Sequence, residues 1–228
     1  MIWAVRALLV IASCVLIAGC SSGDAKEQAA VPSPSDTTTP EAASTPSPSA
    51  SVASSDPCDL LSDRELHQLA GGAVSAARPG MTGGLANCQW ATSDGRFIQA
   101  IGSTSPYWAQ SLPDALRSIE SSGLITDAED LKKLRDGAKL VEAGQDLDPV
   151  KACSLFSEML ELQGQPEGSL WIVTAVPNRE TPMAVSGQMC SGGRFTSVMV
   201  ADEAGLEGPV PIEQVAQVLG SAHRKNLG

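Results

Sequence analysis

Four cysteines lie in the part of the chain that has the composition of a folded domain: Cys58, Cys88, Cys153 and Cys190. A zinc site would need cysteines or histidines a few residues apart, and the intervals of 30, 65 and 37 residues contain no such pair. An even number of widely spaced cysteines is instead typical of disulfide bonds in exported proteins. Of the three pairings, we predict Cys58–Cys88 and Cys153–Cys190, because each would join a helix to a nearby strand of a hairpin.

Residues that could catalyse a reaction are few. His67 falls on the outer side of a predicted helix, and His223 falls in the last turn of the last helix, where a cationic ring would suit the helix dipole. Asp146 and Asp148 lie in a turn without the further ligands of a calcium loop. The serine elbow GxSxG and the phosphate-binding glycine loops are missing. The sequence therefore predicts no catalytic residue, cofactor or metal, although carboxylates that meet only in space would escape notice.

One pair of aromatic residues could form a contact surface. Tyr107 and Trp108 stand between a predicted strand and a predicted helix, in a chain with only four tryptophans, one tyrosine and three phenylalanines. Connections of this kind often carry binding residues. We therefore expect both rings to be partly exposed, the alternative being a loop folded over the edge of the core. Trp90 and Trp171 fall on predicted strands, and we expect both in the core.

The N-terminal segment is typical of an export signal. After Arg6, residues 7–19 are uncharged and mostly apolar. This apolar segment is too short to span a bilayer as a permanent transmembrane helix and fits the apolar region of a signal peptide. The segment ends Leu-Ile-Ala-Gly-Cys20 before polar residues, and this resembles a bacterial lipobox, in which the cysteine receives diacylglycerol. Use of Cys14, or an uncleaved signal anchor, is the alternative. We predict a signal peptide over 1–19 and an acylated Cys20, with palmitate among the acyl chains, anchored at the outer face of the cell membrane.

Residues 20–56 are predicted to be a tether. Pro, Ser, Thr and Ala dominate this segment, which has too little apolar surface to offset the entropy lost on folding. Such a segment spans roughly 35 Å as a flexible coil and up to roughly 110 Å as extended polyproline. Glycosylation of its Ser and Thr residues would stiffen it further.

The remaining residues, 57–228, have the patterns of one α+β domain. A capping box at Ser62–Glu65 predicts a short helix. Further helices are predicted over 111–121, from Thr126, from Asp148 and from Pro211. Strands are predicted over 86–92, 96–102, 169–176, 183–190 and 194–201, with 138–143 as a weaker candidate. These elements predict an antiparallel sheet of five or six strands with helices against one face and two disulfides.

The start of this domain resembles a known family. Asp56-Pro57-Cys58-Asp59-Leu60-Leu61, continued to Leu66, and later Cys88-Gln89-Trp90, are similar to the opening of the actinobacterial lipoproteins grouped as domain of unknown function 3558. These carry a lipobox, a Ser/Thr/Pro linker and a C-x-W strand. The resemblance covers 56–90 well and is vaguer over 100–150. The resemblance implies a lipid-anchored location and this order of signal, linker and domain, and it implies no established activity.

The charge and the missing motifs narrow the class of function. With 15 basic and 26 acidic residues the net charge is −11, which argues against a nucleic-acid partner. We therefore expect a non-catalytic envelope protein, held to the membrane by its lipid anchor, that binds a partner protein, a lipid or a cell-wall component. The alternatives are an envelope hydrolase that uses carboxylates, a carrier of lipids or other hydrophobes, and a structural component. An enclosed apolar cavity would favour the carrier, and a cleft with convergent carboxylates would favour the enzyme.

Overall fold

The computed structural model describes residues 56–121, 147–202, 204–206 and 211–228, together with Lys132, Arg135, Lys139 and Glu142. The predicted signal peptide, Cys20 and the tether up to residue 55 lie outside the described residues, as does most of the predicted helix from Thr126. Lys139 and Glu142 are helical, which differs from the strand predicted over 138–143.

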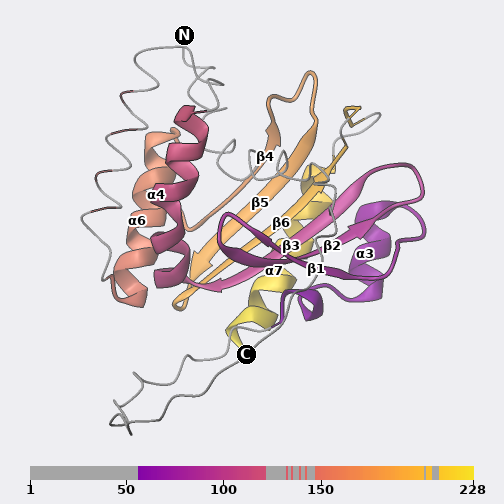
Figure 1. The fold of residues 1–228 in the computed structure, drawn as a ribbon, viewed down its shortest axis with the longest axis horizontal. Helices are drawn as coiled ribbons and strands as arrows, with labels where there is room; N and C mark the ends of the chain where they lie inside the picture. Colours follow the sequence, from indigo (N-terminus) through magenta and orange to yellow (C-terminus); the bar gives the residue numbers. More distant parts are fainter. Residues whose placement is uncertain are drawn as a thin grey trace, which may run out of the picture.

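Six strands form one antiparallel sheet (Figure 1). They are β1 (Arg78–Thr82), β2 (Leu85–Ala91), β3 (Phe97–Thr104), β4 (Trp171–Val176), β5 (Ala184–Ser191) and β6 (Arg194–Ala201). Their spatial order is β1-β2-β3-β6-β5-β4, so that two three-stranded meanders meet where β3 pairs with β6. The sequence did not predict β1, because Pro79 and Gly80 are unfavourable in a strand interior and are tolerated here at the edge of the sheet.

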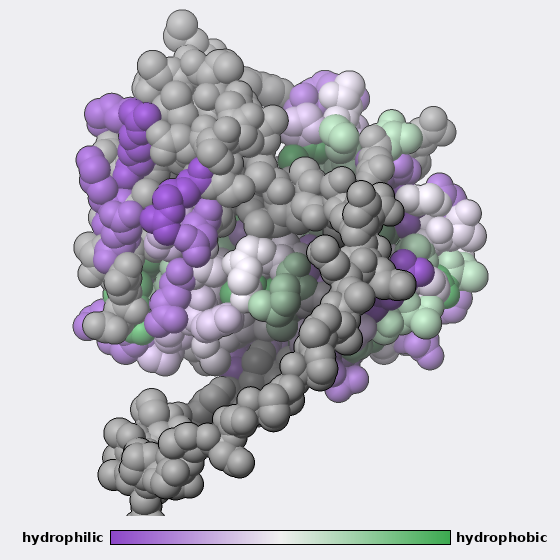
Figure 2. Space-filling model, viewed as in Figure 1, coloured by the Kyte–Doolittle hydropathy of each residue, from purple (hydrophilic) through white to green (hydrophobic). Residues whose placement is uncertain are grey.

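Helices cover both faces of the sheet. The short 3-10 helix η2 (Pro57–Asp59), α3 (Asp63–Ala70) and α7 (Ile212–Leu227) pack on one face, and α4 (Ser105–Ser121) and α6 (Pro149–Leu162) pack on the other. The α+β class is confirmed, but the expectation of helices on one face differs from the structure. The physical reason is that the central strand β6 is buried on both sides, with Phe195 in one cluster and Val198 in the other. The outer surface over α4 and α6 is hydrophilic (Figure 2).

Both predicted disulfides are present. Cys58 joins η2 to Cys88 on β2, and Cys153 on α6 joins Cys190 on β5. Each bond thus links a helix to a strand, which was the basis of the predicted pairing.

Local sequence signals place most helix ends. Ser62 and Glu65 form the predicted capping box at the start of α3. Asp148 caps α6 by accepting hydrogen bonds from two backbone N–H groups. α4 begins six residues before the predicted 111, and Pro113 lies inside it. Among the described helices, none is both long and apolar enough to cross a membrane.

Candidate functional site

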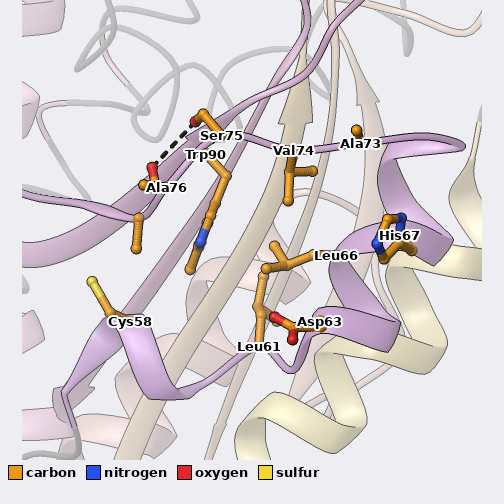
Figure 3. A pocket seen from close by; sticks show the side chains of 11 residues that line it. Cys58, Leu61, Asp63, Leu66, His67, Ala73, Val74, Ser75, Ala76 and Trp90 are labelled. Atoms are coloured by element: carbon orange, nitrogen blue, oxygen red, sulfur yellow. Dashed lines mark hydrogen bonds between the residues drawn. The ribbon is translucent and has the colours of Figure 1, made fainter.

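An open pocket of about 510 Å³ lies between α3 and the extended segment 73–77 (Figure 3). Backbone contacts hold this segment along the end of β2. The N–H of Ser75 donates to the carbonyl of Ala91, and the hydroxyl of Ser75 accepts from the N–H of Ala91, at 2.8 and 2.9 Å. Val74 forms a bridge with Thr92. The pocket wall is thus a short extension of the sheet beside β2.

The floor of the pocket is apolar and its rim carries the polar groups. Trp90 and Val74 descend from the sheet side and Leu66 of α3 points toward them, while His67 lies at the outer side of the helix (Figure 3). Trp90 is buried, as predicted, and forms part of the core cluster on the α7 face. Asp63 supplies a carboxylate at the rim. An apolar floor with a few polar groups at the edge is typical of ligand sites.

The sequence builds this pocket through three local devices. The capping box fixes where α3 begins, and Gly71, with a φ of 66°, ends it in the left-handed conformation that favours glycine. The Cys58–Cys88 bond then holds η2 beneath β2. Paired glycines such as Gly71-Gly72 indicate the end of a helix, but they do not show that the following residues return along β2. For that reason the pocket residues Leu66 and Val74 were not predicted as a site.

A second, polar pocket of about 400 Å³ lies between α3 and α7. There the ammonium of Lys225 pairs with Glu65 at 2.9 Å and donates to the carbonyl of Leu60 at 3.0 Å. Partial burial alone would raise the pKa of Glu65, but hydrogen bonds from Ser221, Ser62 and Lys225 lower it to about 2. The charges are therefore engaged with one another, and this contact attaches the end of α7 to the start of the domain.

His223 is buried and does not lie at an exposed end of the last helix. The expectation of a cationic ring that interacts with the helix dipole is therefore wrong. Its Nε2 lies 2.7 Å from the hydroxyl of Ser191, and its Nδ1 lies 2.9 Å from the hydroxyl of Thr196. The side-chain amide of Asn226 donates to Thr196 as well. Burial lowers the pKa of His223.

The hydrogen bonds around His223 favour one tautomer of its ring. The hydroxyl of Thr196 can direct its proton to Nδ1 because it already accepts from Asn226, and Nε2 then donates to Ser191. In that tautomer His223 is no base for Ser191, and the cluster joins α7 to the β5–β6 turn.

The structure separates the two aromatic residues of the predicted contact surface. Both lie in the first turn of α4 and not in a loop. The side chain of Tyr107 is 51% exposed and donates a hydrogen bond to the carbonyl of Gly84. Trp108 is only 5% exposed, stacks on Phe195 with 4.9 Å between ring centroids, and meets Phe156 edge-on. The expectation that both rings are exposed is therefore wrong for Trp108, because helix α4 turns that side chain into the core.

The prediction that Trp171 lies in the core is also wrong. Its side chain is 54% exposed because β4 is an edge strand and Trp171 is its first residue. Asp148 has the helix-capping role expected of it, and Asp146 lies outside the described residues. Within the described part of the chain, no group of three or more His, Cys, Asp or Glu side chains is placed to hold a metal ion.

Comparison with known proteins gives one match. Residues 15–112 match the family model of a protein of unknown function, DUF3558. No curated protein and no solved structure matches the chain. The match spans η2, the pocket-forming α3 and the first three strands, and ends in α4. The resemblance drawn from the opening motif and the C-x-W strand is confirmed by this match to the DUF3558 family model.

Proposed function

We propose that this protein is a lipid-anchored, extracytoplasmic binding module that has no catalytic centre of its own and that holds an apolar group of an envelope partner in the pocket beside α3. The observation that carries the proposal is the pocket, whose floor is formed by Trp90, Leu66 and Val74. Its volume of about 510 Å³ falls in the range of small-molecule sites.

The open shape of the pocket favours a group that protrudes from a larger ligand. A carrier would enclose its cargo, whereas this pocket opens to solvent between α3 and residues 73–77 (Figure 3). Full burial of one large aliphatic or aromatic group contributes about 1.5–3 kcal/mol. Asp63 and His67 at the rim can then orient the polar part of the ligand.

A fluorescent apolar probe tests the pocket. N-phenyl-1-naphthylamine should bind the full chain with a saturable rise in fluorescence. Ala76 is exposed and lines the pocket, so Ala76→Trp should fill it and weaken probe binding at least tenfold. Ala86→Trp adds the same ring at an exposed alanine of β2 outside the pocket lining and should leave binding unchanged. Equal binding by both variants would contradict the proposal.

The anchor is tested separately. Protein extracted from membranes should begin at Cys20 and carry the added mass of diacylglycerol, measured by intact mass spectrometry. Cys20→Ala should abolish that mass, because the thiol is the acyl acceptor. A mature N-terminus elsewhere, or no lipid mass on the wild-type protein, would show that the anchoring part of the proposal is wrong.

A further inference from the structure

Exposed apolar side chains gather at one end of the sheet. Seven large apolar residues of the described chain are exposed. Six of them belong to elements that meet where β3 and β5 end: Met81, Tyr107, Val150, Leu170, Trp171 and Leu227. The seventh, Met183, precedes β5 at the opposite end of the sheet. We call the six residues the apolar end.

The contacts of the β5–β6 turn show that these elements are neighbours. A side chain on Gly192 would collide with Leu227, and one on Gly193 would collide with Pro149, next to Val150. Both glycines have a positive φ, of 55° and 76°, so the turn requires them for conformation and for space. The N–H of Cys190 donates to the carbonyl of Leu170, which places the start of β4 beside the same turn.

The opposite edge of the sheet contributes to the same end. Tyr107 reaches the β1–β2 turn through its hydrogen bond to Gly84, and Met81 stands in that turn's first strand. The start of α4 is fixed to the β5–β6 turn because the N–H of Ser105 donates to the carbonyl of Gly193. The six residues of the apolar end therefore lie at the same end of the fold, distributed between the β1 edge and the β4 edge of the sheet.

The chain enters the domain at this end. Lys225, two residues before Leu227, donates to the carbonyl of Leu60. Leu60 lies close enough to Gly102, near the end of β3, that a methyl group there would meet it at 2.9 Å. The predicted anchor at Cys20 thus connects to the domain beside the apolar end.

Two of the cations near this end are paired with carboxylates, and a third, Arg194 at the start of β6, is half-buried. Lys151 pairs with Asp148 at 3.3 Å, and Lys225 pairs with Glu65 at 2.9 Å. Since these cations are already neutralised, an acidic or anionic partner gains little from them. The apolar end instead exposes apolar side chains, including Trp171 and Tyr107. Tryptophan and tyrosine are the residue types favoured at membrane–water interfaces.

We propose that the apolar end docks on the lipid surface of the bilayer that carries the anchor, with Trp171 and Leu227 in the interface. This inference rests on the lipid anchor of the proposed function. Docking leaves free the part of the pocket that Trp90 and residues 73–77 line, because these residues lie nearer to the other end of the sheet, while Cys58 and Leu61 of the lining belong to the segment that enters the domain beside the apolar end. A domain held in this way presents its pocket to partners outside the membrane.

The test uses the lipidated protein in vesicles of phosphatidylcholine with brominated acyl chains, which quench nearby tryptophans. Trp171 is exposed, whereas Trp90 and Trp108 are only 3% and 5% exposed, so the quenching should report on Trp171. Trp171→Phe should remove the quenching. Leu227→Ser should reduce it at least twofold, and the matched control Met183→Ser, at the opposite end, should leave it unchanged. Because the contact is apolar, 0.5 M salt should have little effect.

Three results would overturn the inference. These are no quenching of the wild-type protein, quenching that persists in Trp171→Phe, and shielding of Trp171 from aqueous iodide together with a doubled molecular mass, which would indicate a second copy on this surface. Failure of the anchor is distinguishable, because it appears as missing lipid mass. In that case, unlipidated chain that begins at residue 20, and so lacks Trp3 and the apolar segment 7–19, is added to the same vesicles, and the same quenching decides docking.

Discussion

Acid should destabilise this protein in a pH range where its carboxylates are still ionised, and His223 should be the cause. The ring is only 3% exposed, and burial lowers its pKa below the ordinary 6.5. The charged side chains nearest to it along the strand and helix, Arg194 opposite Ser191 and Arg224 beside it in α7, are cations, so they do not favour a charged ring. In this pH range the imidazole of His223 therefore binds a proton in the unfolded chain but not in the folded chain, so the free energy of unfolding rises with pH.

The size of the effect follows from one proton. If folded His223 stays neutral, the free energy of unfolding falls by at most about 1.4 kcal/mol between pH 7.5 and 5.5. Glu65, with its pKa lowered to about 2 from 4.5, begins to lose its stabilising effect only as the pH approaches 4.5 from above. The range above pH 5.5 therefore isolates the histidine.

Urea unfolding followed by circular dichroism at several pH values measures this slope. His223→Gln should flatten it, since the glutamine does not titrate, whereas His67→Gln removes the other histidine, which is exposed on α3, and should keep the slope. Titration of the His223 ring by NMR gives a second measurement that does not depend on the variant folding well. A slope that survives in His223→Gln, or a folded ring that titrates at or above pH 6.5, would refute the reasoning.

Three further outcomes are expected in urea unfolding of the full chain. Trp108→Ala should lower the free energy of unfolding by about 3–5 kcal/mol because it empties a buried aromatic site, whereas Tyr107→Ala should change it by less than about 1 kcal/mol; similar losses would contradict the separation of the two rings. Replacing Cys153 and Cys190 together by Ala should cost about 3–4 kcal/mol, since the loop no longer restricts the unfolded chain, and non-reducing peptide mapping of the wild type should show the two joined and no free thiol. Ser62→Ala should cost about 1 kcal/mol through the lost cap of α3, and an unchanged midpoint would count against the capping role.

Signals that act over a few residues predicted much of this fold. The capping box at Ser62, the helix start at Asp148 and the short turn between the strands predicted over 183–190 and 194–201 each depend on neighbours in sequence, and each is present in the structure. The disulfide pairing could be predicted for the same reason, since each bond lies within one half of the chain.

Side-chain burial was harder to predict because it depends on which surface a helix meets. His223 and Asn226 continue the face of α7 that buries Val215 and Leu219, so the periodicity contained the signal, but two polar residues concealed it. Trp108, Ala109 and Leu112 likewise share one face of α4 once the helix is known to begin at Ser105. The pocket escaped prediction because residues 73–77 follow paired glycines and their place beside β2 is a long-range contact.

The order of strands in the sheet has a consequence for how the chain can reach its native topology. β1–β3 and β4–β6 are meanders that need only short loops. The pairing of β3 with β6, which we call the seam, runs from Phe97↔Ala201 to Thr104↔Arg194 and joins residues 90 to 104 positions apart. Neither disulfide crosses that seam. Cys153–Cys190 lies within the connection from β3 to β6 and bypasses the 37 positions between its cysteines, but this eases loop closure by only about 0.5 kcal/mol, because the entropy depends on the logarithm of loop length. Each half can acquire its crosslink before the halves meet. The rate of folding should then depend on the seam, which is a high-contact-order step, and should change little between oxidised and reduced protein.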